Sequence, residues 1–476
     1  MNLLLFSGQS GGQRSIRSLL ITLSALVGLL LSGVGCGPGS DVPSLPVDAQ
    51  CKQSAQISGG QASGGRPYLS SISMQNETTG WGVIIGAKEE GQGSVTMTGD
   101  FSILHTSDGG CRWKLLRAWK RDSHDRQDFI PFFISPTTAW VEFNDQIYST
   151  SDSGANWITH QLPIAPGEVA GIEQLFFLNG HVGWMLATVG RPSSLSLNAN
   201  PTEIARAEAT KEAIEKSKTR VLQTSQDRMV LWQTRDGGQH WTELLRSRIS
   251  DIPGSLFPYS GTVRAMYFLN ETTGWITLQG EDSGSRITSR IITTHDGGRT
   301  WQKLTLIPPG RSTTKPEFFY LGTPRFFSQR DGLIPVVLEQ AIPKGVSIFI
   351  THDGGASWHS TPLFGIDYNQ VAITPGPGGA VPAIYLLIPE PYFVDMNTGW
   401  IGHTAMFQTS DGGQHWQHFD PHLPLDYLDP GVQFLTKQVG WALQYIYGES
   451  TPDSLARLYK TRDGGKTWTW IPYSVS

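Results

Sequence analysis

The chain has 476 residues, with 54 glycines, 29 prolines and 16 tryptophans, and only 16% of its residues are charged. This composition is typical of many short strands joined by tight turns and argues against a helical bundle. The formal net charge is −5, from 36 lysines and arginines against 41 acidic residues, and no basic stretch is interleaved with aromatic residues. Nucleic acid is therefore not an expected partner.

The first 36 residues are predicted to be an export signal outside the fold. Arg14 and Arg17 precede an apolar run of sixteen residues, which ends in small residues before Cys36. The ending Leu-Ser-Gly-Val-Gly-Cys resembles a bacterial lipoprotein signal, although Gly33 stands where that pattern usually has leucine. We expect a lipid on Cys36 that holds the protein at the outer face of a bacterial membrane. The alternative is an uncleaved anchor helix, for which the run is short against a bilayer of about 30 Å.

Residues 37–65 are rich in glycine, serine, glutamine and proline, and they are predicted to form a flexible tether. If Cys36 carries lipid, Cys51 and Cys111 remain, which is an even number in an exported chain. They are a possible disulfide between the tether and the first repeat. The alternative, two free thiols, stays open at this point.

A segment with the pattern Thr-x-Asp-x-Gly-x-x-Trp recurs seven times after the tether. An aspartate in a hairpin turn accepts hydrogen bonds from the backbone of that turn, and glycine supplies positive φ. The aspartates are therefore expected to be structural and not catalytic or calcium-binding. They are Asp108, Asp152, Asp236, Asp296, Asp353, Asp411 and Asp463.

A second signature, in most copies Gly-Trp, precedes each of these segments. Its last residues are Trp81, Trp140, Trp184, Trp275, Leu333, Trp400 and Trp441. Each unit reads as four short strands, and the units recur at intervals of 44 to 84 residues. We therefore predict an all-β fold over residues 66–476, a seven-bladed β-propeller with four-stranded antiparallel blades. One helix is predicted on its surface, over about residues 200–223.

The repeated segments resemble the Asp box, or bacterial neuraminidase repeat. Together with the Gly-Trp signature, they most resemble the propellers of the photosystem II stability and assembly factor family, over about residues 66–476. In that family, members assist assembly of a photosynthetic complex by holding a membrane subunit. Asp boxes also occur in sialidases, other glycosidases and sorting receptors, so the resemblance implies a fold more than a function. No binding residue is carried over from it.

Both regular turns of each unit are expected on one face of the propeller, and the variable connections on the other. The connections of variable length run over 86–101, 189–228, 360–389 and 447–454. Binding is expected on this loop-bearing face and near the central axis.

The residues that could support catalysis or metal binding are scattered. His105, His240, His295, His352 and His415 fall in different blades, so neither a metal nor a cofactor is expected. The Arg-Ile-Pro segment typical of sialidases is missing, and Gly65-Arg66-Pro67 is its only echo.

The spacing does not decide whether inward-pointing acids approach one another as a glycosidase pair. The acids considered are Glu142, Glu173 and Asp395. The leading prediction is a monomeric, non-enzymatic binding scaffold for a protein, peptide or glycan, and the family resemblance extends this prediction to a role in assembly of a membrane complex. The alternative is an exported glycoside hydrolase.

Overall fold

The computed structural model describes residues 46, 48, 51, 66–89, 95–120, 129–143, 146–166, 168–190, 228–248, 262–281, 287–309, 320–338, 345–366, 390–402, 406–419, 423, 431–445 and 456–475. The export signal predicted over 1–36 and the helix predicted over about 200–223 lie outside these residues. The described part of the chain contains no helix, and so none that is long and apolar enough to cross a membrane.

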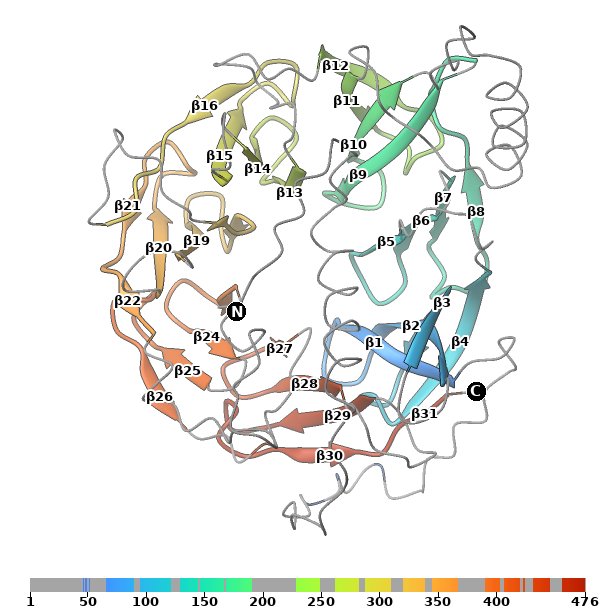
Figure 1. Ribbon diagram of the computed structural model, residues 1–476, viewed down its shortest axis with the longest axis vertical. Helices are drawn as coiled ribbons and strands as arrows, with labels where there is room; N and C mark the ends of the chain where they lie inside the picture. Colours follow the sequence, from blue (N-terminus) through green and yellow to red (C-terminus); the bar gives the residue numbers. More distant parts are fainter. Residues whose placement is uncertain are drawn as a thin grey trace, which may run out of the picture.

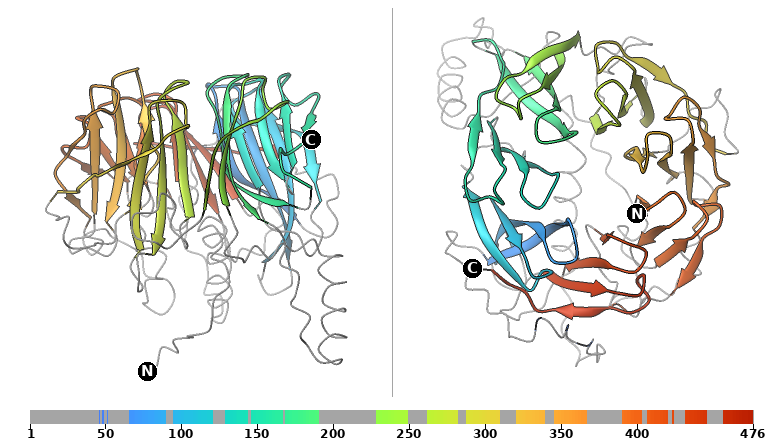
Figure 2. Two further views of the ribbon diagram at one scale, coloured as in Figure 1. Left: turned by 90° about the horizontal axis from the view of Figure 1, so that it is seen from above. Right: turned by 180° about the vertical axis from the view of Figure 1, so that it is seen from behind.

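The described strands form seven sheets arranged around a central axis (Figure 1). Seen from the side, the sheets stand next to one another in a flat disc (Figure 2). The prediction of an all-β, seven-bladed propeller with four-stranded antiparallel blades is confirmed. We number the blades 1 to 7 in chain order and call the junction between two neighbouring blades a seam.

Blades 1 to 4 each run outward from an inner strand near the axis. Their strands are β1 (Arg66–Met74), β2 (Gly80–Glu89), β3 (Val95–Thr106) and β4 (Arg112–Trp119); β5 (Phe129–Phe133), β6 (Ala139–Phe143), β7 (Gln146–Thr150) and β8 (Ile158–His160); β9 (Val169–Phe177), β10 (Gly183–Gly190), β11 (Arg228–Thr234) and β12 (Thr242–Arg248); β13 (Thr262–Phe268), β14 (Gly274–Glu281), β15 (Ile287–Thr294) and β16 (Gln302–Leu304).

Blades 5 to 7 follow the same order, except that the inner and outer strands of blade 5 are each split in two. Their strands are β17 (Tyr320–Leu321), β18 (Arg325–Phe326), β19 (Gly332–Leu338), β20 (Gly345–Thr351), β21 (His359–Ser360) and β22 (Phe364–Gly365); β23 (Tyr392–Phe393), β24 (Gly399–Gly402), β25 (Met406–Thr409) and β26 (Gln417–Phe419); β27 (Gly431–Phe434), β28 (Gly440–Tyr445), β29 (Ala456–Thr461) and β30 (Thr469–Ile471).

The core of the disc lies in the seams. Every residue of β10 and of β19 is buried, because the second strand of a blade has a neighbouring sheet on each side. The apolar clusters accordingly combine residues from adjacent blades, such as Trp184 of blade 3 with Phe268 of blade 4. Burial on both faces explains why a strand of only five residues, β6, is stable here, since all five of its residues are buried.

The ring is closed between blades 7 and 1 by two segments, which together we call the clasp: β31 (Ser474–Val475) and residues 46, 48 and 51. Strand β31 leaves blade 7 and pairs in parallel with β4 of blade 1. In the other direction, the backbones of Pro46 and Asp48 hydrogen-bond to Trp470 on the outer strand of blade 7.

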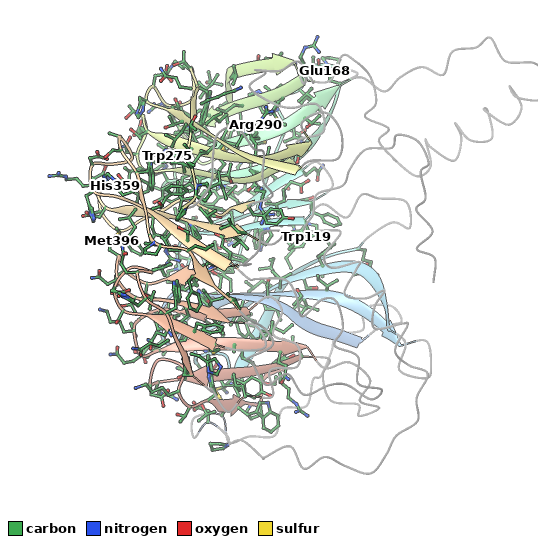
Figure 3. All side chains as sticks on the ribbon, turned by 60° about the vertical axis from the view of Figure 1, so that its left-hand side comes forward. Trp119, Glu168, Trp275, Arg290, His359 and Met396 are labelled. Atoms are coloured by element: carbon green, nitrogen blue, oxygen red, sulfur yellow. A yellow bond between two sulfur atoms is a disulfide. The ribbon has the colours of Figure 1, made fainter. Side chains whose placement is uncertain are left out.

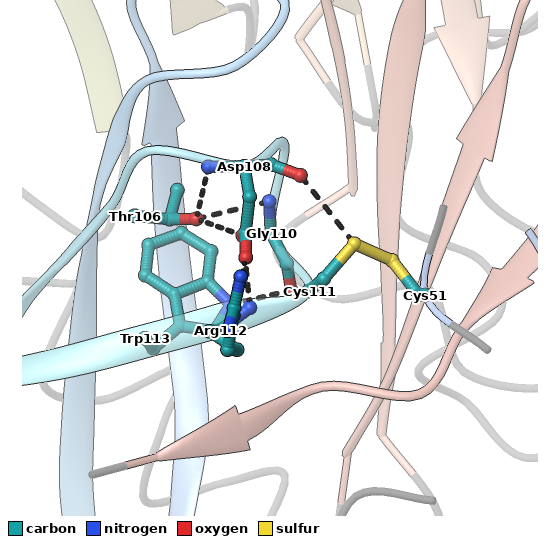
Figure 4. Close-up of polar contacts among 7 residues, drawn as sticks. All are labelled: Cys51, Thr106, Asp108, Gly110, Cys111, Arg112 and Trp113. Atoms are coloured by element: carbon teal, nitrogen blue, oxygen red, sulfur yellow. Dashed lines mark hydrogen bonds and ion pairs between the residues drawn. A yellow bond between two sulfur atoms is a disulfide. The ribbon is translucent and has the colours of Figure 1, made fainter. Parts of the chain in front are cut away.

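The clasp is also held by side chains. The carboxylate of Asp48 is 3% exposed and forms an ion pair of 2.7 Å with Arg462. Cys51 is joined to Cys111 by a disulfide, which ties the segment to blade 1 (Figure 4). Within the tether predicted over 37–65, residues 46, 48 and 51 are therefore docked on the disc, while the other tether residues lie outside the described part.

Candidate functional site

The seven recurring segments form hairpins between the third and fourth strands of each blade, and we call them the aspartate hairpins. Figure 4 shows the one in blade 1. Thr106 Oγ1 donates to Asp108 Oδ1 over 3.0 Å and accepts a hydrogen bond from the backbone N–H of Gly110. Asp108 Oδ1 also accepts from the backbone of Arg112, and the Arg112 side chain donates to Oδ2.

The same bonds recur in all seven hairpins. The residue four positions after each aspartate donates to it twice, once from the backbone and once from the side chain; these residues are Arg112, Asn156, His240, Thr300, Ser357, His415 and Thr467. The residue after the aspartate has positive φ, and Ser153 takes that conformation in blade 2, where the other blades have glycine.

These hydrogen bonds stabilise the ionised carboxylates. Burial opposes ionisation of Asp236 and Asp296, but hydrogen bonds from the hairpin outweigh it and lower the pKa of each carboxyl to about 2. In blade 5, the side chain and backbone of Ser357 hold the pKa of Asp353 well below its usual range. An ionised carboxylate whose oxygens are already hydrogen-bonded is a poor general acid or base at neutral pH.

The aspartate hairpins and the Gly-Trp turns lie on the same face of the disc, as the sequence predicts. Within each blade the two turns are joined by a backbone bond, for example from Gly109 N–H to the carbonyl of Thr78. The connections of variable length therefore leave the strands at the opposite face, which we call the loop face. The seven aspartates are distributed around the hairpin face, one in each blade.

The candidate histidines do not converge either. His240 and His415 each bond the aspartate of their own hairpin, His352 bonds Asp331, and His105 packs its ring against Trp81. In the described part of the chain, no group of three potential metal ligands is present.

A serine, a histidine and an aspartate meet at the seam between blades 2 and 3, which the sequence does not reveal. Ser149 Oγ lies 2.7 Å from Nε2 of His160, whose side chain is almost fully buried next to the hairpin of Asp236. The carboxylate oxygens of Asp236 are occupied by Thr234 and His240. Burial lowers the pKa of His160, although the nearby Asp236 carboxylate opposes this shift.

The three acids considered for a glycosidase pair lie in different settings. Glu142 is buried in β6 of blade 2, and Glu173 on β9 of blade 3 accepts a hydrogen bond from Thr188. Asp395 is in the Gly-Trp turn of blade 6, where it accepts bonds from the backbone of that turn and forms an ion pair with Lys437. The structure therefore keeps Asp395, on the hairpin face, apart from the other two.

A cavity of about 350 Å³ lies where the inner strands of blades 5 and 6 meet. Leu333 and Phe393 lie at its base and are each only 1% exposed, whereas Arg325, Tyr392 and, from blade 7, Val432 are partly exposed and line it. Glu390 and Thr323 also line it and are exposed, so the cavity is open to solvent. Glu390 precedes β23, which runs towards the hairpin face, so the opening lies on the side of the loop face.

On the polar side of the cavity, the guanidinium of Arg325 packs against the aromatic ring of Tyr392. The guanidinium carbon of Arg325 lies 4.5 Å from the ring centre of Tyr392, and an Arg325 N–H donates to the Tyr392 hydroxyl over 3.3 Å. Phe327 lies on another side of the guanidinium, at 5.6 Å. An arginine fixed in this way keeps further N–H donors for a carboxylate or a carbonyl group.

The carboxylate of Glu390 connects the two blades. Its Oε1 accepts a hydrogen bond of 2.8 Å from the backbone N–H of Thr323 in blade 5. A side chain at Gly322 would collide with this carboxylate, so glycine is what lets Glu390 approach the backbone.

None of the residues selected from the sequence as catalytic or metal-ligand candidates lines this cavity. Arg325 and Tyr392 are 67 residues apart, and no local pattern indicates that they meet. The one sequence signal was the fifth Gly-Trp signature, which has Leu333 in place of tryptophan.

These features define the chain as a seven-bladed β-propeller with a cavity between two of its blades. No family model matches the chain, and no curated protein matches it.

Among solved structures, it is similar to YCF48 bound to D1 peptide, with 14% identity, a TM-score of 0.41, and coverage of 89% of this chain and 97% of that one. It is similar to YCF48 from Cyanidioschyzon merolae, with 16% identity, a TM-score of 0.42, and coverage of 82% and 95%. A GH74 xyloglucanase from Xanthomonas campestris has 10% identity and a TM-score of 0.37, with coverage of 88% and 68%. Likenesses this distant carry no inference about ligand or activity.

Proposed function

We propose that this chain is an exported, membrane-attached binding protein without catalytic activity, which recognises a protein or peptide through the cavity between blades 5 and 6. The described lining of the cavity supports this proposal: a fixed guanidinium, an apolar wall and one carboxylate that is bonded to backbone. Such a lining can hold and orient a ligand group. Glycoside hydrolysis instead requires two carboxyl groups about 5 to 9.5 Å apart.

The size and chemistry of the cavity favour a short piece of polypeptide. Its volume of about 350 Å³ is at the lower end of ligand sites, which suits one or two residues. Arg325 is placed to bind a carbonyl or carboxylate, while the partly exposed Tyr392 and Val432 offer apolar surface in the same cavity. A peptide presents these two kinds of group next to each other. The lipid expected on Cys36 would display the site at the outer face of the membrane, next to membrane proteins under assembly.

Site-specific photo-crosslinking in the native membrane tests this function. A benzophenone amino acid at the exposed position of Thr323 is expected to capture a protein partner. The same group at Ile158, 57% exposed on the outer strand of blade 2, is not. Arg325→Ala should weaken capture about tenfold or more, because hydrogen bonds to a charged group contribute about 1.5–3 kcal/mol. Arg235→Ala, which removes an exposed arginine from the hairpin face, is the matched control.

The alternative, a glycoside hydrolase, is tested on the same protein. A panel of fluorogenic glycosides is expected to give no turnover. Turnover that Glu390→Gln abolishes would contradict the binding proposal and would assign the cavity to hydrolysis.

A further inference from the structure

Exposed apolar side chains gather on one side of the rim of the disc. Among the described residues, four large apolar side chains are exposed, and three of them lie on the outer strands of consecutive blades. Trp470 on β30 of blade 7 is 37% exposed, Leu115 on β4 of blade 1 is 39% exposed, and Ile158 on β8 of blade 2 is 57% exposed. These strands follow one another along the rim (Figure 1). The fourth residue, Ile307, follows β16 of blade 4, which is on the opposite side of the ring.

The other blades show that the fold does not require apolar residues at these positions. The residue two positions after the hairpin tryptophan is Leu115 in blade 1 and Trp470 in blade 7, but in blades 2 to 6 it is polar: Thr159, Glu243, Lys303, Ser360 and His418. The residue one position after that tryptophan is Ile158 in blade 2. In blade 5 it is His359, which lies at the rim (Figure 3). The exposed apolar side chains are therefore particular to blades 7, 1 and 2.

The chain joins the disc at the same part of the rim. The N–H of Trp470 donates to the carbonyl of Pro46 over 3.0 Å, and the N–H of Asp48 donates to the carbonyl of Trp470 over 2.9 Å. The ion pair between Asp48 and Arg462 holds this segment in place. Pro46 is ten positions after Cys36, where the expected anchor ends. Whether that anchor is a lipid or an uncleaved helix, it brings the membrane to this side of the ring.

The same part of the rim is basic. Strand β4 has three basic residues and no acidic one, and Lys114 is exposed beside Leu115. Lys466 in the hairpin of blade 7 is also exposed. The acids of the two neighbouring hairpins, Asp108 and Asp463, are occupied by hydrogen bonds within their turns. Lysines next to exposed apolar side chains suit a surface of anionic lipid headgroups, and tryptophan is favoured at that depth.

We propose that the outer strands of blades 7, 1 and 2 form a membrane-contact surface, which rests on anionic phospholipid headgroups. Trp470, Leu115 and Ile158 insert between the headgroups, and Lys114 and Lys466 bind their phosphate groups. This inference rests on the membrane attachment in the proposed function and goes beyond it, because it fixes the orientation of the disc. The ring stands on its edge, so that neither the hairpin face nor the loop face lies flat on the membrane.

Photo-crosslinking to lipid tests this surface in the full, membrane-attached chain. The protein is reconstituted into vesicles of equal parts phosphatidylglycerol and phosphatidylcholine, with a benzophenone amino acid at Leu115 or at Ile158. Both positions are expected to form phospholipid adducts, which are measured by the mass added to the corresponding peptide. The same group at Ile307, which is 43% exposed, is the matched control and should form at least about threefold less adduct.

Charge reversal tests the surface without changing its apolar residues. Lys114→Glu is expected to lower the lipid adduct from Ile158 at least about threefold, because anionic headgroups repel the new carboxylate. Lys303→Glu makes the same change at an exposed lysine on β16 of blade 4 and should leave the adduct unchanged. Both lysines are exposed, so the melting temperature of each variant should match that of the wild type.

Several results would overturn the inference. Equal lipid adducts from Ile158 and Ile307, or an adduct that Lys114→Glu leaves unchanged, show that the disc has no preferred side towards the membrane. Adducts from Leu115 with a protein or a second copy of the chain, in place of lipid, show that the rim is a protein interface.

The failure of this surface is distinguishable from the failure of the proposed function. Attached protein that forms no lipid adduct at either position shows that the anchor holds while the rim stays clear of the membrane. Protein that remains in solution contradicts the attachment and the surface together. Capture of a partner from Thr323 is measured separately, so the binding function can stand when the membrane-contact surface does not.

Discussion

At the residue scale, the repeated aspartate is a structural group. In each hairpin it accepts hydrogen bonds from the preceding threonine and from the residue four positions later, as Asp296 does from Thr294 and Thr300. The threonine hydroxyl in turn accepts from a buried glycine N–H. Each turn therefore satisfies its own polar groups, and the aspartate hairpins need no ligand or metal to be stable.

Acid should weaken the propeller through these carboxylates. The pKa of Asp236 and Asp296 is lowered to about 2 in the folded protein, against an ordinary value of 3.8. A lowered pKa contributes stability that is present above pH 4 and is lost as the pH falls from about 4 to about 2. The melting temperature is therefore expected to fall across this interval, and to fall less in Asp296→Asn. Glu243→Gln removes an exposed acid outside the hairpins and is the control; equal acid sensitivity in all three proteins would contradict this account.

At the element scale, the clasp joins each end of the described chain to the blade formed by the other end. Strand β31 extends blade 1 and residues 46 and 48 extend blade 7, so the seam between these blades is crossed in both directions. The disulfide between Cys51 and Cys111 makes one of these crossings covalent. A ring of stacked sheets is most vulnerable where its first and last blades meet, since these two blades are not consecutive in the chain.

Reduction should therefore weaken the ring. The disulfide has a sequence separation of 60 residues, and closing a loop of that size is worth about 4 kcal/mol in the chain-entropy model. In urea unfolding, addition of reductant is expected to lower the free energy of unfolding of the wild type by about this amount. The Cys111→Ser variant should show the same lower free energy of unfolding without reductant. If reductant leaves the unfolding midpoint of the wild type in place, the disulfide does not stabilise the ring.

The sequence predicts the elements better than the site, for a physical reason. The bonds of an aspartate hairpin span four residues, as from Asp108 to Arg112, so a short pattern contains all of them. Arg325 and Tyr392 meet only because blades 5 and 6 are neighbours, and Asp48 meets Arg462 across 414 residues. Leu333 was visible as a departure from the repeat, but a single departure does not show whether the neighbours close the gap.

At the scale of the whole molecule, the order of the parts places the disc close to its predicted anchor. Residue 46 is docked on the outer strand of blade 7, only ten positions after Cys36. An extended chain of ten residues spans at most about 36 Å. A lipid on Cys36 would therefore hold the rim near blades 7 and 1 close to the membrane surface.

The anchor has its own test. Cys36→Ser is expected to release the protein from membranes, or to leave an uncleaved precursor, because the serine cannot carry the lipid. Partitioning into detergent phase and intact mass measure both effects, and Cys111→Ser is the matched control for loss of a cysteine that we do not expect to be lipidated. Unchanged mass and unchanged partitioning of Cys36→Ser would contradict lipidation.

The central claim is that the molecule is a closed ring that binds a protein or peptide through the cavity beside the inner strands of blades 5 and 6. Photo-crosslinking from Thr323 in the native membrane tests it most directly. The account predicts that a benzophenone amino acid at Thr323 captures a protein partner and that Arg325→Ala weakens this capture about tenfold or more. Capture that is equally strong from Ile158, or that Arg325→Ala leaves unchanged, would contradict it.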